Sequence, residues 1–125
     1  MTAFRAVVLE HFRHPRNRGP LDGANASEEG ANPLCGDRIR IQLHVNDGAI
    51  VDARFTADAC AICIASASVL TEHVRGKTVR EANSVDLPWL NQALEGAPPA
   101  GRVKCAVLPL DTLRRALAGV RETAT

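Results

Sequence analysis

Four cysteines occupy three separate segments of the chain, and each segment lies where the sequence pattern changes from one element to another. They are Cys35, Cys60, Cys63 and Cys105. Thiolates are preferred ligands of Zn²⁺ and of iron–sulfur clusters. Thiols at the ends of elements can converge on one such centre, whereas thiols that only pack usually lie in the middle of an element. The placement therefore favours a metal or cluster site.

A carboxylate accompanies these thiols and completes a possible ligand set. Asp37 lies two residues after Cys35, and the glycine between them allows the backbone to turn tightly. Cys60 enters a predicted helix, whose N-terminal N–H groups stabilise a thiolate. Cys105 also lies near the predicted start of a helix. Three thiolates and one carboxylate could form a tetrahedral Zn²⁺ site or hold an iron–sulfur cluster with one oxygen ligand.

Cys63 allows a different interpretation of the same region. It falls one turn into an apolar helix, which favours packing over metal ligation. With Cys60 it forms a Cys-X-X-Cys pair at a helix start, a pattern that also occurs in thiol–disulfide oxidoreductases. That distant alternative lacks a βαβ framework before the motif and leaves Cys35 and Cys105 without a role. The histidines are predicted to be solvated or packed rather than ligands; they are His11, His14, His44 and His73.

Length and charge limit the classes of protein to which the chain can belong. Its 125 residues fit one domain, which we expect to span 1–125. The formal net charge of +1, with acids and bases interspersed, favours neither nucleic acid nor an anionic membrane as a partner. The N-terminal residues lack the long apolar stretch of a signal peptide or membrane span. We therefore expect a cytoplasmic protein with reduced thiols, for which metal binding is commoner than structural disulfides.

The N-terminal third predicts one short helix and a long loop. Residues 4–12 place apolar side chains at helical spacing, and Pro15 disfavours helical geometry at the residue before it. Residues 16–34 are rich in Gly, Asn and Pro, which predicts a loop with one weak edge strand near 27–31. Loops of this kind often carry functional residues.

The rest of the chain predicts a hairpin followed by helices. Residues 39–45 alternate between apolar and polar side chains, and Val51, Ala53 and Phe55 take the apolar positions of a second strand after a turn at 46–48. Small and apolar residues then predict a helix that Gly76 ends. The remaining predicted elements are short helices at 78–82 and 88–94, a linker at 96–101 and a closing amphipathic helix with its stripe at 110–120. The fold class is therefore α+β, a small antiparallel β-sheet with helices packed on one face.

Several motifs resemble those of the U-type iron–sulfur cluster assembly proteins, the IscU/SufU/NifU N-terminal family, from about Val8 to about Leu117. The matching motifs are His14-Pro15-Arg16-Asn17-Arg18-Gly19, Cys35-Gly36-Asp37, Asp52-Ala53-Arg54-Phe55, Cys60 with Ile64-Ala65-Ser66-Ala67-Ser68, Gly76-Lys77 and Lys104-Cys105. Their order, spacing and context agree with the family.

The resemblance implies both a site and a function. Cys35, Cys60 and Cys105 would be the family cysteines and Asp37 the family aspartate, together binding zinc at rest and a transient [2Fe–2S] cluster during assembly. Sulfur would arrive as persulfide from a cysteine desulfurase, and clusters would pass to recipient apo iron–sulfur proteins. Cys35 would be the sulfur acceptor, with Cys105 as the alternative. The chain would then be an assembly scaffold, or alternatively a zinc-dependent sulfurtransferase.

The sequence also departs from both branches of this family. IscU-type members carry His before the last cysteine and a Leu-Pro-Pro-Val-Lys segment, whereas this chain has Lys104 and Ala97-Pro98-Pro99-Ala100-Gly101. Arg102 and Lys104 resemble the SufU type and could stabilise a persulfide anion on Cys105. The SufU-type insertion between the second and third cysteines is absent, and Cys63 is extra to either pattern. Scaffolding and sulfur relay therefore both stay open.

Overall fold

The computed structural model of the chain describes residues 5–34 and 36–120. Within them the order of elements is α1 (Ala6–Arg13), β1 (Ala26–Asn32), β2 (Asp37–Asn46), β3 (Ala49–Asp58), α2 (Ala61–Val74), α3 (Val79–Asn83), α4 (Leu87–Ala93), the 3₁₀ turn η1 (Ala100–Arg102) and α5 (Val103–Ala118). Cys35, a predicted ligand and sulfur acceptor, lies outside the described residues.

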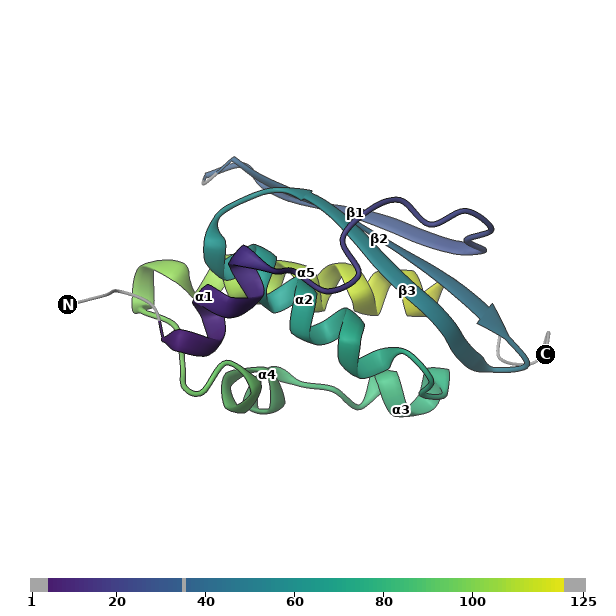
Figure 1. The fold of residues 1–125 in the computed structure, drawn as a ribbon. Coiled ribbons are helices and arrows are strands. Elements are labelled where there is room, and N and C mark those ends of the chain that lie inside the picture. The colour runs from purple at the N-terminus through teal and green to yellow at the C-terminus, as the bar shows by residue number, and fades with distance from the viewer. Residues whose placement is uncertain (1–4, 35, 121–125) are drawn as a thin grey trace.

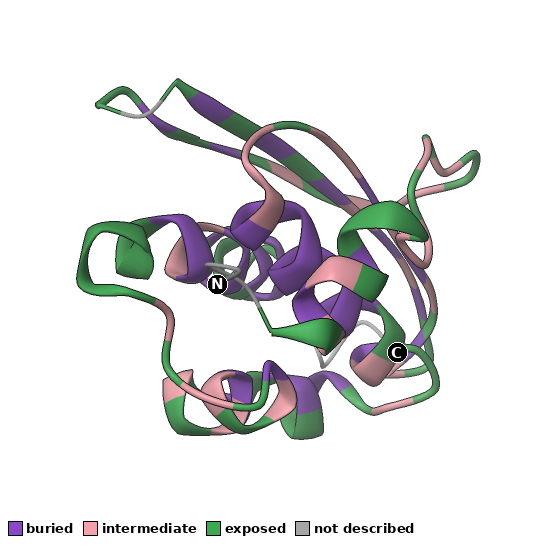
Figure 2. Ribbon diagram, turned by 60° about the vertical axis from the view of Figure 1, so that its left-hand side comes forward, coloured by how far each residue is buried: buried purple, intermediate pink, exposed green. Residues whose placement is uncertain are grey.

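The strands form an antiparallel sheet in the order β1-β2-β3, and the helices lie together on one of its faces (Figure 1). α5 packs against β1 and β2, and α2 packs against β3, α1 and α5. Figure 2 shows that buried residues (purple) follow the strands and fill the central helices beneath them. The predicted α+β class, with helices on one face of a small antiparallel sheet, is confirmed.

The β2–β3 hairpin follows directly from its local sequence. Every second residue of β2 from Ile39 to Val45 is buried, and the residues between them are exposed or half-buried. Asp47 and Gly48 both have positive φ, 53° and 75°, as a tight two-residue hairpin turn of type I′ requires. The turn residues thus fix the register that places the apolar face of β2 on the helices.

β3 differs from the prediction at its first residues. Val45 pairs with Ile50, but His44 pairs with Asp52, so Val51 is an extra residue in the ladder. Such a bulge moves the preceding residues to the opposite face. Ile50 is therefore fully buried and Val51 is 52% exposed, so the prediction that Val51 starts the apolar alternation was wrong.

The segment predicted as a long loop first runs along the β3 edge of the sheet and then continues into β1, the strand at the opposite edge. Asn17 and Gly19 exchange backbone hydrogen bonds with Phe55 of β3, at 3.0 and 2.8 Å. The weak strand predicted near 27–31 is a seven-residue strand, β1. At Gly30 an added Cβ would lie 2.1 Å from Thr112 Oγ1 of α5. β1 thus approaches α5 so closely that only glycine fits there.

α2 is the central helix, because it is apolar on nearly all sides. Eleven of its residues are buried, including Ser66, Ser68 and Thr71. Its small side chains allow neighbouring elements to approach closely, and Gly76 follows its end with φ of 83°. The short helices α3 and α4 begin at the capping residues Thr78 and Asp86. No helix of the described residues is both long and apolar enough to cross a membrane.

Candidate metal centre

Three of the predicted ligands meet where β2, α2 and α5 begin. Asp37 is the first residue of β2, Cys60 is the N-cap of α2, and Cys105 lies in the first turn of α5. One ligand atom of each residue lies within 4.8 Å of the corresponding atoms of the other two. The start of three elements at one end of the molecule therefore brings together groups that are far apart in the sequence.

Asp37 is oriented by the backbone around it. Gly36, with φ of 74°, donates its N–H to the Asn32 carbonyl at 2.8 Å and turns the chain into β2. The carboxylate is only 3% exposed, and its Oδ1 accepts a hydrogen bond from the Cys60 N–H at 3.1 Å. Its Oδ2 is buried and has no hydrogen-bond partner among the described residues. Because an unpaired buried carboxylate oxygen is costly, the arrangement favours a cation in the site.

Cys60 is the most accessible of the three ligands. It is half-buried and has the extended backbone of an N-cap residue, with φ of −71° and ψ of 169°. Its side chain makes no capping hydrogen bond. The N-terminus of α2 stabilises negative charge on its sulfur. Cys60 is thus a candidate sulfur ligand at the start of α2.

Cys105 is fully buried, and it belongs to a helix rather than to a linker. The prediction placed it between the linker and the last helix, but α5 already begins at Val103, so this boundary was wrong. Burial raises the pKa of the Cys105 thiol, and the proximity of Asp37 and Cys60 raises it further. A divalent cation opposes this effect, because metal-bound cysteine is deprotonated.

Arg102 lies beside the thiols from the end of η1. The proximity of Cys105, and next that of Cys60, raises the pKa of the exposed Arg102 guanidinium. Lys104 is exposed and borders a groove of about 290 Å³ with Asn32, Pro33 and residues of α5. Of the two cations singled out in the sequence, Arg102 is the one that the structure places against a thiol.

Cys63 is buried just below this centre. It is fully buried in the core and occupies the first turn of α2. Burial raises the pKa of its thiol, and the charges of Asp37, Cys60 and Cys105 add to this effect. It is absent from the group of ligand atoms within 4.8 Å of one another. Its burial agrees with the packing interpretation, although three possible ligands surround it.

The histidines lie elsewhere, as expected for packed or solvated residues. His11 is buried and hydrogen-bonded through Nδ1 to Ser68 Oγ at 2.7 Å. The ring of His73 lies 4.3 Å from that of Trp89, centroid to centroid. His14 is exposed and His44 is half-buried on the open face of β2. None of the four belongs to the ligand group at the centre.

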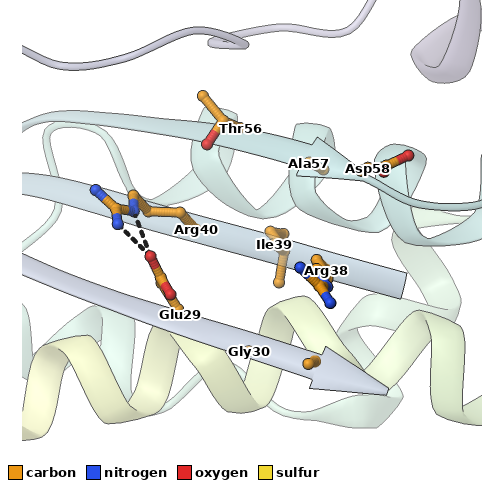
Figure 3. Close-up of a pocket in the computed structure, with 9 residues that line it drawn as sticks. Glu29, Gly30, Arg38, Ile39, Arg40, Thr56, Ala57 and Asp58 are labelled. Atoms are coloured by element: carbon orange, nitrogen blue, oxygen red, sulfur yellow. Dashed lines mark hydrogen bonds and ion pairs between the residues drawn. The ribbon is translucent and has the colours of Figure 1, made fainter. Parts of the chain in front are cut away.

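A larger hollow of about 720 Å³ lies on the face of the sheet that the helices leave open (Figure 3). Arg40 and Glu29 form an ion pair across it, and Arg38, Thr56 and Asp58 line its other part. None of its lining residues is a cysteine or histidine. It is a shallow polar surface, whereas the soft metal ligands belong to the centre formed by Asp37, Cys60 and Cys105.

Comparison with protein families gives one match over nearly the whole chain. Residues 3–124 match the family described as NifU-like N terminal domain. The iron–sulfur cluster assembly scaffold protein IscU 1 of Archaeoglobus fulgidus is 38% identical, over 88% of this chain and 71% of that protein. The zinc-dependent sulfurtransferase SufU of Bacillus subtilis is 33% identical, over 94% and 90%. IscU of Escherichia coli is 37% identical, over 93% and 92%.

Solved structures have the same fold. The chain is similar to a putative iron–sulfur cluster assembly scaffold protein for the SUF system from Fervidobacterium islandicum, with a TM-score of 0.81 and 28% identity, over 92% of this chain and 96% of the other. It also shares its fold with an N-terminal NifU-like protein of Brucella abortus, with a TM-score of 0.72 and 23% identity, over 91% of each chain.

Proposed function

This chain belongs to the NifU-like N-terminal domain family, and on that basis we propose that it is a scaffold for iron–sulfur cluster assembly. One observation carries the proposal most directly: Asp37, Cys60 and Cys105 converge, and a buried Asp37 oxygen has no hydrogen-bond partner among the described residues. Two thiols and a carboxylate oxygen fit Zn²⁺ as well as the iron of a cluster. The cluster is the cargo of the scaffold, built there and then passed on.

We assign the fourth ligand position to Cys35, which lies two residues before Asp37. Bound zinc would hold the thiols as thiolates and draw β2, α2 and α5 together. Asp37 orients the site through its hydrogen bond with the Cys60 N–H. A carboxylate oxygen binds zinc or cluster iron less strongly than a thiolate sulfur does. We therefore expect the Asp37 position to be the one that opens for exchange.

Sulfur relay is the second candidate function, and the position of Arg102 favours it. In a relay, the Cys35 thiolate would attack the terminal sulfur of a cysteine desulfurase persulfide, and the desulfurase thiolate would leave. Cys105 is the alternative acceptor. The Arg102 guanidinium, which lies near Cys105, would stabilise a persulfide anion there. A zinc-dependent sulfurtransferase would thus use the same residues as the scaffold.

One experiment separates the two functions. Anaerobic protein is mixed with iron, cysteine and a cysteine desulfurase, and both desulfurase turnover and visible absorbance are followed. A scaffold develops a bound [2Fe–2S] chromophore that transfers to an apo-ferredoxin. A relay instead accelerates desulfurase turnover in a zinc-dependent way, and Cys35→Ala abolishes the acceleration. Cys63→Ala is the matched control and leaves either activity intact, whereas loss of activity in Cys63→Ala alone would favour an oxidoreductase.

A further inference from the structure

The function proposed above leaves Cys63 unused, although it lies directly beneath the candidate metal centre. Its thiol is free and fully buried, and Asp37, Cys60 and Cys105 all lie near enough for their charges to act on it. Asp37 Oδ2, which has no hydrogen-bond partner among the described residues, is buried in the same region. Cys63 is therefore a buried thiol close to the proposed ligands.

Cys60 and Cys63 have the geometry of a helix-start dithiol. Cys60 is the N-cap of α2 and Cys63 is the third residue of the helix, so their side chains lie on the same side of its first turn. Cys60 has the extended backbone of an N-cap residue, whose side chain faces the second and third residues of the helix, and Cys63 is the third. A disulfide needs Cβ atoms about 3.5–4.5 Å apart. Because Cys60 lies outside the helical backbone, a change in its own φ and ψ can bring the two Cβ atoms to that separation while α2 stays intact.

We propose that Cys60 and Cys63 form a redox switch, in which oxidation to a disulfide withdraws Cys60 from the metal centre and releases the metal. The switch rests on the proposed role of Cys60 as a ligand. Cys105 is the competing partner for Cys60, because their sulfurs lie within 4.8 Å. While metal is bound, however, Cys105 is itself a proposed ligand, whereas Cys63 is not. Cys63 is therefore the thiol that is available to react.

The oxidant would be a peroxide, which oxidises the two cysteines in two stages. The half-exposed Cys60 thiolate attacks one peroxide oxygen, which breaks the O–O bond, forms a sulfenic acid and releases hydroxide. The Cys63 sulfur then forms the S–S bond, and its proton leaves with the sulfenic hydroxyl as water. The two thiols lose two electrons, and a dithiol reductant returns them by exchange. Burial protects Cys63 from direct oxidation.

The test treats zinc-loaded protein with a small excess of hydrogen peroxide and follows zinc release with a chromogenic chelator. We expect wild-type protein to release about one zinc per chain. Peptide mapping should find the Cys60–Cys63 disulfide, and dithiothreitol should restore zinc binding. Cys63→Ala and Cys63→Ser should bind zinc normally when reduced, but should recover several-fold less zinc binding after peroxide, because Cys60 proceeds to irreversible acids.

Three results would overturn the switch. They are a mapped Cys60–Cys105 disulfide, full recovery of the Cys63 variants after peroxide, and loss of zinc from wild-type protein without a disulfide. If reduced wild-type protein binds no zinc, the proposed metal function fails separately. In that case, peptide mapping of peroxide-treated, metal-free wild-type protein still tests whether Cys60 and Cys63 form a disulfide. The same measurement applies if a Cys63 variant does not fold, because it needs no variant.

Discussion

Asp37 differs from the sulfur ligands in both chemistry and environment. One oxygen of its carboxylate accepts the Cys60 N–H, and the other is buried with no partner in the part of the chain that the structure describes. Carboxylate oxygen binds soft metal centres less strongly than thiolate does. We therefore expect Asp37 to control how readily the proposed centre opens and the cysteines to control whether it forms.

At the residue scale, we expect Asp37→Ala to yield a longer-lived bound cluster that transfers more slowly to an apo-ferredoxin. The reason is the loss of the most exchangeable ligand position. Cys60→Ser and Cys105→Ser should instead weaken zinc and cluster binding. Decay of the cluster absorbance measures the first effect, and metal content measures the second. Equal loss of cluster in all three variants would contradict a special exchange role for Asp37.

At the scale of elements, one close contact joins the sheet to a helix and another joins two helices. β1 packs on α5 through the bare backbone of Gly30, and α1 packs on α2 through the hydrogen bond between His11 and Ser68. Ser68 Oγ also accepts the Arg16 N–H at 2.8 Å, so one hydroxyl of α2 connects α1 with the segment that follows it. Both contacts lie outside the metal centre but support the elements that build it.

The Gly30 contact predicts a steric effect. Gly30→Ala should destabilise the fold by about 1–3 kcal/mol, because its Cβ would lie 2.1 Å from Thr112 Oγ1. Adding Thr112→Ala should restore part of the loss, since the two sites are coupled. Gly101→Ala is the control, because nothing lies within 4 Å of its Cβ position. Urea unfolding measures all of these variants, and equal stability of Gly30→Ala and wild type would refute the close approach.

The His11 contact predicts a pH dependence of stability. Burial is the main cause that lowers the pKa of His11 from 6.5, and the nearby Arg16 charge is the next. Below pH 6.5 the unfolded state binds more protons than the folded state, so stability falls as the pH falls through that value toward the folded pKa. Burial also lowers the pKa of His73, which acts in the same direction.

Urea unfolding midpoints measured from about pH 8 to about pH 5 test this effect, because that range spans the ordinary pKa of histidine. His11→Gln should reduce the loss of stability between about pH 8 and about pH 5. His73→Gln is the matched variant for the other histidine. If the pH profile of His11→Gln were identical to that of wild type, His11 would not be responsible for the acid sensitivity.

At the scale of the whole molecule, the candidate metal centre lies where three separate elements begin. Its described ligands come from β2, α2 and α5, which reach both the sheet and the helix layer. A ligand that binds only the folded state stabilises it in proportion to its affinity. Metal binding and folding should therefore be coupled across the molecule rather than within one loop.

Removal of zinc tests this coupling. Metal-free protein should melt at a lower temperature than zinc-loaded protein, by an amount equivalent to about 4 kcal/mol when free zinc is roughly 1,000 times its Kd. Scanning calorimetry with and without a chelator measures the shift, and Cys105→Ser should abolish it. If the metal-free and zinc-loaded proteins melted at the same temperature, a closed native metal site would be excluded.

Short-range sequence patterns were sufficient to predict the local elements and the types of the candidate ligands. Alternation in β2, the turn at Asp47 and Gly48 and the glycine after α2 act over a few residues, so local physics was sufficient to predict them. The thiol and carboxylate types likewise predicted soft-metal chemistry without any knowledge of geometry. The resemblance to the U-type family then gave a fold and function that agree with the comparisons.

Features that depend on contacts between distant segments could not be predicted in this way. The bulge that exposes Val51 depends on pairing with β2, and the start of α5 before Cys105 depends on how its first turn packs. The sequence did not reveal that Asp37 Oδ2 is buried without a partner or that Arg102, rather than Lys104, lies against a thiol. Burial and proximity are set by the packing of the whole chain, and a residue's own neighbours in sequence do not encode them.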